Sequence, residues 1–100
     1  MDPDLPDIIV SDVVISTAGR DQGELFYVVG TDPVYLMLAN GKDRTLDKPK
    51  RKKRKHVQKV LRAETRVAAK LSSGDKVLNS ELRRDLAFQS RALQSNNLGG

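Results

Sequence analysis

The stretch "VVISTAGRDQGELFYVV", Val13–Val29, decides the fold that this chain is expected to adopt. Val13–Thr17 is a short run rich in β-branched residues, which favours a strand, and it ends at the turn sequence "AGRDQG". Gly19 and Gly23 bracket that turn, where the missing Cβ atoms permit positive φ angles. A second strand, Glu24–Val29, follows directly. The stretch therefore predicts two antiparallel strands joined by a glycine-bounded loop.

Three more strands are predicted downstream of this pair. Turn residues at "GTDP" end the second strand, and an apolar run at Val34–Ala39 predicts the third. The dipeptide "NG" at Asn40 and Gly41 is typical of a tight hairpin, which places a fourth strand at about Lys42–Leu46. Pairing resumes near Val57, whose side chain is expected to face inward.

The second and third strands are apolar on both faces, so one face can fill a small barrel while the other needs a cover. The C-terminal part of the chain supplies that cover as two helices. Helical spacing relates Val60, Leu61, Val67, Ala68 and Leu71, and "SSG" at residues 72–74 ends this first helix. The second helix begins after Asn79 as N-cap and carries Leu82, Leu86 and Leu93 on one side.

The predicted fold class is therefore mainly β with a C-terminal α part. A five-stranded small barrel occupies residues 11–60, and two short helices follow within residues 61–95. Residues 1–10 form an acidic, Pro-containing head that we expect to be flexible, and residues 96–100 form a disordered tail.

Composition restricts the class of protein. One hundred residues with 38% apolar content suit one domain with a modest core, which disfavours an enzyme with a deep substrate cavity. The absence of Cys excludes disulfides, thiolate nucleophiles and cysteine zinc sites, and suits a reducing compartment. No apolar run approaches the length of a membrane span, and the acidic start is unlike a secretory signal. We expect a soluble, cytoplasmic protein.

The net charge of +5 is distributed very unevenly. Residues 1–41 carry a net charge of −6, residues 42–59 carry +8, and residues 60–100 carry +3. Clustering of this kind creates a local positive field that a polyanion can exploit. The central segment is the candidate binding region.

Six consecutive basic residues, Lys50–Lys55, form the centre of this segment. In a regular barrel strand, alternate side chains would point into the core, and unpaired buried charge costs several kcal/mol. We therefore expect an exposed loop over residues 48–55, opened by Pro49 and held by folded structure at Leu46 and Val57. With no acid from Lys48 to Lys59, the basic residues should repel one another until a polyanion approaches.

Several roles compete for this basic segment. A solvated charged surface and a nuclear-import signal each remain open, and so does a protein-interaction adaptor in which the barrel and the helices bind an acidic partner. A membrane role is disfavoured because the chain has neither Trp nor a lipidation motif. Nucleic acid fits best, since neutralised phosphates release counterions, and charge alone does not distinguish RNA from DNA.

Other chemistry finds little support. His56 is the single His, so catalytic dyads and multi-His metal sites are excluded, and we expect this side chain to be packed or in contact with backbone. The four aromatic residues all lie in apolar patterns, so a stacking platform for bases is largely missing and recognition should use shape and phosphates. Arg20 is a candidate for a forked contact to a phosphate or a base edge, or alternatively a local partner of Asp21 or Asp32.

The Val13–Val29 stretch resembles the KOW motif of ribosomal proteins and transcription elongation factors, with residues 19–23 in the positions of its loop. The wider span from Asp12 to about Val60, including "LANGKDRTLDKPKRKKRKH", looks like the small bacterial KOW-domain RNA-binding proteins related to large-subunit ribosomal protein fourteen, the e type. It departs from many KOW motifs in having Phe26 where they have another Gly, which weakens the analogy to elongation factors.

The resemblance implies an SH3-like barrel that docks on structured RNA, foremost large-subunit ribosomal RNA, in a ribosome-associated protein. Neighbouring ribosomal proteins are further candidate partners. No enzymatic activity, cofactor, metal or small-molecule substrate is predicted. The predicted RNA-binding residues are Gly19, Arg20, Asp21, Gln22, Gly23, Lys42, Arg44, Lys48, Lys50, Arg51, Lys52, Lys53, Arg54, Lys55, His56 and Lys59.

Overall fold

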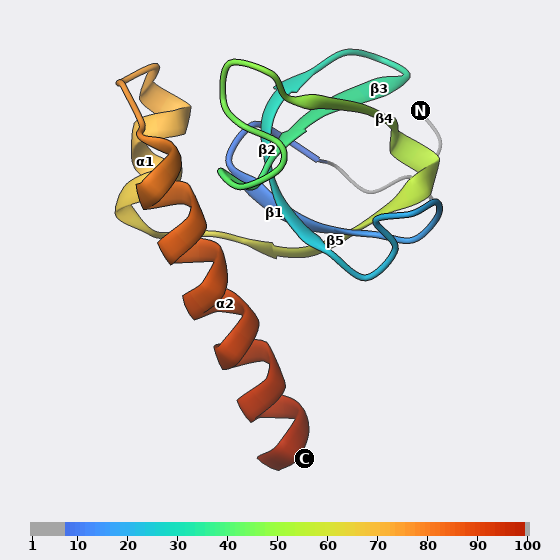
Figure 1. Cartoon of the computed structure of the whole chain (residues 1–100), viewed down its shortest axis with the longest axis vertical. Coiled ribbons are helices and arrows are strands. Elements are labelled where there is room, and N and C mark those ends of the chain that lie inside the picture. The colour runs from blue at the N-terminus through green and yellow to red at the C-terminus, as the bar shows by residue number, and fades with distance from the viewer. Residues whose placement is uncertain (1–7, 100) are drawn as a thin grey trace.

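A curled antiparallel sheet with two helices against one of its faces makes up the described part of the chain, residues 8–99 of a computed structural model (Figure 1). The strands are β1 (Asp12–Ser16), β2 (Leu25–Thr31), β3 (Tyr35–Ala39), β4 (Lys50–Lys53) and β5 (Val57–Arg62). A single 3-10 turn, η1 (Arg54–His56), joins β4 to β5, and the helices are α1 (Arg66–Ser73) and α2 (Asn79–Gly99).

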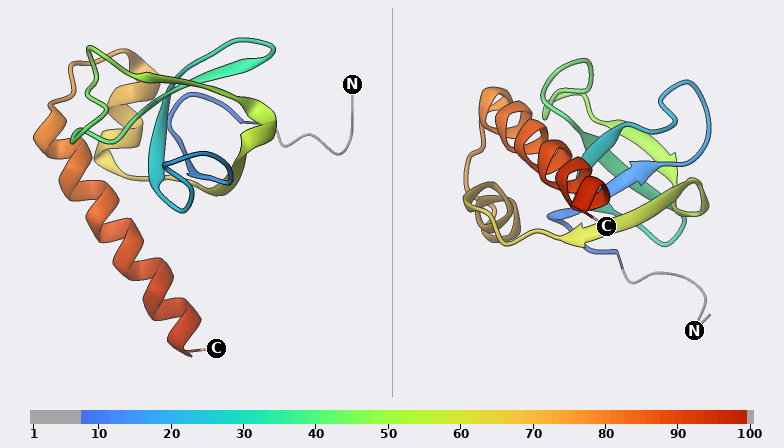
Figure 2. Two further views of the ribbon diagram at one scale, coloured as in Figure 1. Left: turned by 45° about the vertical axis from the view of Figure 1, so that its right-hand side comes forward. Right: turned by 90° about the horizontal axis from the view of Figure 1, so that it is seen from below.

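The strand order is β4-β3-β2-β1-β5, with every neighbouring pair antiparallel. The prediction of five strands followed by two helices is confirmed. β4 and β5 are the two edges, and η1 carries the chain from one edge to the other (Figure 2). The sheet curls around its inner face without a ladder between these edges, so it is an open sheet and not a closed barrel.

Each face of the sheet has its own hydrophobic core, because side chains alternate along the strands. Val14 and Phe26 point to the inner face, whereas their neighbours Val13 and Tyr27 point to the outer one. The inner core consists of Ile8, Val14, Phe26, Val28, Leu36, Leu38 and Val57. The outer core consists of Val13, Tyr27, Ala39, Ala63, Val67, Ala68, Leu82 and Leu86. The helices thus cover the second apolar face, and Val57 faces inward, as the pattern predicted.

The prediction that the head is flexible is wrong for its last residues. Ile8 is buried in the inner core, and the Ile9 N–H donates a hydrogen bond of 2.9 Å to the Asp12 carboxylate. The Ser11 N–H donates to the Val28 carbonyl at 2.8 Å, which extends the pairing beyond β1. The rest of the predicted head, residues 1–7, lies outside the described residues.

No strand forms at Lys42–Leu46, contrary to the hairpin prediction. Asn40 Oδ1 accepts hydrogen bonds of 3.0 Å from the backbone N–H groups of Lys42 and Arg44. The Arg44 carbonyl accepts from the N–H groups of Asn40 and Gly41. These local bonds use the backbone groups that a strand would pair, so residues 40–48 form a compact loop.

The fourth strand is instead the basic run itself, and the prediction of an exposed loop over residues 48–55 is wrong for Lys50–Lys53. β4 pairs with β3 in the register Leu36↔Lys52 and Leu38↔Lys50. The alternation that argued against a strand does occur, since Lys52 is buried and Arg51 and Lys53 are exposed. The buried Lys52 ammonium group has the Asp21 carboxylate as its counter-charge, at 2.6 Å.

The helices begin later than predicted. Val60 and Leu61 belong to β5, where continued pairing with β1 prevails over helical spacing, although both still pack against the outer core. α1 begins after Thr65, whose hydroxyl accepts from the Ala68 N–H at 3.1 Å. It ends at Ser73, and Gly74 caps it with a φ angle of 79°, as the "SSG" signal predicted.

α2 differs from the prediction at both ends. Asn79 is its first residue and not its N-cap, because Asn79 Oδ1 accepts from the Leu46 N–H at 2.8 Å and so fixes the 40–48 loop. Glu81 reaches back to the Leu78 N–H at 3.0 Å and satisfies that end of the helix. The helix continues to Gly99, through most of the predicted tail, and residue 100 lies outside the described residues. Within residues 8–99 no helix has the length and apolar character needed to cross a bilayer.

Candidate nucleic-acid interface

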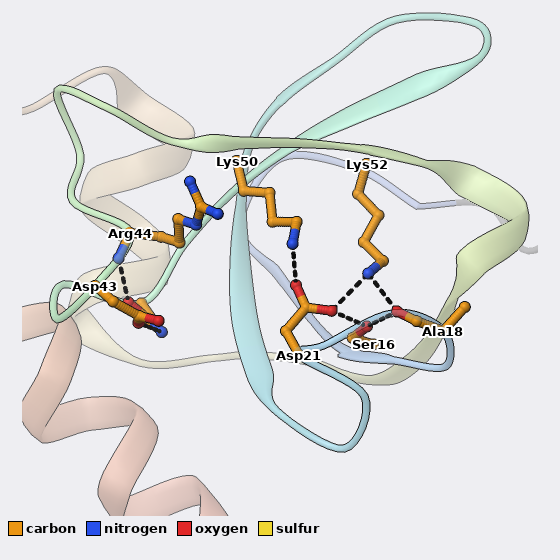
Figure 3. A network of polar contacts seen from close by, with 8 residues as sticks. Ser16, Ala18, Asp21, Asp43, Arg44, Lys50 and Lys52 are labelled. Carbon is orange, nitrogen blue, oxygen red and sulfur yellow. Dashed lines mark hydrogen bonds and ion pairs between the residues drawn. The ribbon is translucent and has the colours of Figure 1, made fainter.

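The glycine-bounded loop between β1 and β2 lies directly against the basic strand β4 (Figure 3). Asp21, at the centre of the loop, places its two carboxylate oxygens 2.7 Å from Lys50 Nζ and 2.6 Å from Lys52 Nζ. Lys52 Nζ also donates to the Ala18 carbonyl at 2.6 Å. Two segments that are far apart in the sequence therefore form one surface.

The Asp21 carboxylate is buried and lies within contact distance of three polar side chains. Besides the two lysines, the Ser16 hydroxyl donates to it at 2.7 Å. Burial alone would raise the pKa of the Asp21 carboxyl, but hydrogen bonds from the two lysines and Ser16 outweigh it and hold that pKa well below its usual value. Asp21 is therefore ionised at neutral pH and fastens the loop to β4.

Internal acids thus neutralise part of the basic segment, contrary to the expectation that only an external polyanion would do so. Asp21 pairs with Lys50 and Lys52. Asp12, which is completely buried, lies 3.5 Å from Lys59 Nζ and 3.2 Å from Arg62 Nε. Both acids come from the N-terminal part of the chain, and neither is near the basic run in the sequence.

The remaining predicted residues divide by exposure. Those exposed to solvent are Gly19, Arg20, Gln22, Gly23, Lys42, Arg44, Lys48, Arg51, Lys53 and Lys55, and those half-buried are Lys50, Arg54, His56 and Lys59. Gly19 and Gly23 have φ angles of 88° and 91°, as the turn required. Asp21 and Lys52 are buried and form an ion pair with each other, so they hold the loop and β4 together at the centre of this surface.

Two shallow hollows flank the contact between the loop and β4. One is lined by basic residues from three segments, Arg20, Arg44 and Lys50, together with Asp21, Glu24, Phe26 and Asp43. The other is lined by Ala18, Gly19, Tyr35, Lys50, Arg51, Lys52, Lys53 and His56. The structure therefore brings the predicted loop residues and most of the basic run together around Lys50.

Three predicted residues have local partners that define their roles. Arg54 Nε donates to the Asp32 carbonyl at 2.9 Å and ties η1 to the β2–β3 turn. The His56 carbonyl accepts from the Thr17 N–H at 2.9 Å, and Lys59 lies beside Asp12 on β5. Lys59 is thus not part of the surface around Lys50.

Arg20 does not act as a local partner for the neighbouring acids. Asp21 is occupied by the two lysines, while the Asp32 carboxylate accepts from the backbone N–H groups of Val34 and Tyr35 at 2.8 and 2.7 Å. These bonds lower the pKa of Asp32. Arg20 is exposed and lines the first hollow together with Arg44.

Sequence reasoning missed three participants in this region. Ser16 lies within the first predicted strand and Asp12 directly before it, and nothing in the sequence marks their contacts with charged partners. Tyr35 lies in an apolar pattern, yet the Arg51 guanidinium carbon is 3.8 Å above its ring centre. Strand register sets all of these contacts, and register across distant segments leaves no local signal.

No protein-family model matches the chain, and no curated protein shows significant sequence similarity to it. Among residues 8–99 no group of three or more His, Asp and Glu side chains is placed to hold a metal ion.

Proposed function

We propose that this protein is a non-enzymatic RNA-binding protein that docks on structured RNA through the surface formed by the 19–23 loop and β4. The observation that carries the proposal is the bridge from Asp21 to Lys50 and Lys52, at 2.7 and 2.6 Å. It joins the loop to the basic strand and leaves the other cations on the outside of a rigid frame.

The fold supports the KOW relationship on which the choice of RNA rests. An order of β4-β3-β2-β1-β5 with a 3-10 turn between the two edge strands is compatible with an SH3-like strand arrangement, although the sheet is open between those edges. The loop that would carry the KOW contacts lies between β1 and β2, with both glycines at positive φ. Large-subunit ribosomal RNA is accordingly the proposed partner, in a cytoplasmic, ribosome-associated protein.

The distribution of charge supports a polyanion as the ligand. The exposed cations near the loop and β4 are Arg20, Lys42, Arg44, Lys48, Arg51, Lys53 and Lys55. Exposed like charges cost little in water, but each one that meets a phosphate releases condensed counterions. Several cations on one folded surface favour a ligand that carries many negative charges along its length, as a nucleic acid does.

The test removes exposed charges and leaves the internal ion pairs intact. The variant carries Lys48→Gln, Lys53→Gln and Lys55→Gln, and the matched control carries Lys76→Gln, Arg84→Gln and Arg91→Gln, which remove equal charge from exposed positions in the helical part. Binding to a structured fragment of large-subunit ribosomal RNA is measured by fluorescence anisotropy from about 50 mM to about 200 mM KCl.

We expect the first variant to bind on the order of several hundredfold more weakly at about 100 mM KCl, with the slope of log affinity against log salt reduced by about 3. The control should retain the wild-type affinity and slope. Equal effects of the two variants would refute the assigned surface. Co-sedimentation with ribosomal particles that disappears on ribonuclease treatment supports the RNA partner, whereas co-sedimentation that survives it supports an acidic protein partner instead.

A further inference from the structure

The outer face of the sheet is covered at one end and open at the other. Tyr35, Met37 and Ala39 share this face of β3, and Ala39 is buried in the outer core beneath the helices. Tyr35 lies at the opposite end, next to Lys53 of β4 in the register Tyr35↔Lys53. Arg51, opposite Met37, shares the same open end.

Arg51 and Tyr35 form a stacked pair at this open end. The guanidinium carbon of Arg51 lies 3.8 Å from the centre of the Tyr35 ring, which is face-on stacking distance. Tyr35 is half-buried and Arg51 is exposed, so the ring lies against the guanidinium of a side chain that remains accessible to solvent. The planar group is thereby held in place before any ligand arrives.

The pair adjoins the proposed RNA surface. Tyr35 and Arg51 line the same shallow hollow as Gly19, Lys53 and His56. A base resting on the guanidinium would have its flanking phosphates close to Lys53, whose side chain is exposed and projects from the same face of β4. This part of the surface therefore places the flat Arg51 guanidinium beside the Lys53 ammonium group, which could contact a phosphate.

We infer that the Arg51–Tyr35 pair is a stacking site for one unpaired nucleobase of the bound RNA. This inference rests on the proposed function. It revises the expectation that stacking platforms are missing, because the platform is a guanidinium and not an aromatic ring alone. Bases in loops and bulges stack readily on Arg planes, whereas bases inside a duplex are covered by their neighbours. The preferred RNA therefore exposes an unpaired base at this position.

The experiment compares two RNA probes and three forms of the full chain. One probe is a hairpin with an adenine-rich loop that contains 2-aminopurine, and the other is a fully paired duplex of equal charge. Arg51→Lys keeps the positive charge and removes the plane. Lys53→Gln removes a neighbouring charge and leaves the stacked pair unchanged, so it is the matched control.

We expect Arg51→Lys to weaken binding to the hairpin by about fivefold or more and to leave duplex binding and the salt slope unchanged. Quenching of 2-aminopurine on binding should be present in the wild type and lost in Arg51→Lys. Lys53→Gln should weaken both probes equally, reduce the salt slope and keep the quenching.

Equal affinity of wild type and Arg51→Lys for the hairpin, or an equal loss on both probes, would overturn the stacking site while leaving the proposed function standing. If the wild type binds the ribosomal RNA fragment but neither probe, the stacking site is wrong and the proposed function stands. If it binds none of the three RNAs, both are wrong. Circular dichroism of each variant verifies that the exposed substitutions leave the fold unchanged.

Discussion

Asp21 shows how one side chain can determine the arrangement of a whole surface. It lies in the loop that the sequence marks as a binding element, yet its carboxylate points inward to Lys50, Lys52 and Ser16. A buried charge is tolerated only when it is paired and hydrogen-bonded. The residue therefore holds the 19–23 loop and β4 together.

Asp21→Asn is expected to lower the free energy of unfolding at pH 7 by about 3 kcal/mol, because the buried Lys52 ammonium loses its counter-charge. Urea denaturation measures the change. Adding Lys52→Met should recover most of the loss, since an apolar side chain needs no partner. A double variant as unstable as Asp21→Asn would show that the cost has another origin.

The same substitution has a pH signature whose sign follows from the lowered pKa of Asp21. In the unfolded chain this carboxyl titrates near its ordinary value of 3.8, and in the folded chain it titrates lower. Its contribution to stability is thus complete above that value and is lost as the pH falls below it. The stability difference between wild type and Asp21→Asn should shrink below about pH 4.

At the level of elements, the 40–48 loop joins the sheet to the start of α2. Asn79 accepts from the Leu46 N–H at 2.8 Å, and Arg83 Nη1 donates to the Gly41 carbonyl at 2.8 Å. Gly41 itself is buried with φ 78° against the first turn of α2. These contacts fix the position at which α2 begins. They also hold residues 40–48 against the helix, so this segment does not pair with β3 as a hairpin strand.

Gly41→Ala tests this contact against a matched glycine. A Cβ at Gly41 would overlap the Asn79 carbonyl oxygen, whereas a Cβ at Gly74, with φ 79°, meets nothing within 4 Å. Gly74→Ala should cost about 1 kcal/mol for the left-handed backbone alone. Gly41→Ala should cost about 2 kcal/mol more, as measured by urea denaturation. Equal losses of unfolding free energy in the two variants would mean that the first turn of α2 moves away from residue 41 without a cost.

At the scale of the whole molecule, the two cores share their strands. β1 supplies Val13 to the outer core and Val14 to the inner one, and β2 does the same with Tyr27 and Phe26. The helices are anchored to this sheet by Leu82 and by the Tyr27 hydroxyl, which donates to the Asp85 carboxylate. The sheet and the helices should therefore unfold in one cooperative transition.

Leu82→Ala is expected to destabilise the protein by about 3 kcal/mol, because Leu82 is fully buried between α2 and the sheet. Amide exchange in β1 and β2 should accelerate by the same free energy as exchange in α2. The control is Leu78→Ala, which removes a side chain that is 52% exposed and should change stability by less than about 0.5 kcal/mol. Faster exchange confined to α2 would show that the helices and the sheet unfold separately.

The sequence by itself determined the local features of this protein. Alternating apolar residues marked β1, β2 and β3, two glycines marked the loop at residues 19–23, and "SSG" marked the end of α1. Apolar residues on both faces of the strands also required a helical cover. Each of these inferences depends on neighbours within a few residues, and local propensities act at that range.

Only the tertiary structure decided which distant groups meet. It turned Lys50–Lys53 into a strand by supplying Asp21 as counter-charge, placed Asn79 against Leu46, and stacked Arg51 on Tyr35. None of these pairings leaves a local signal, because strand register and long-range ion pairing depend on segments that are brought together only by folding. The basic run, which looked like a loop on its own, is a strand because its charges find partners in space.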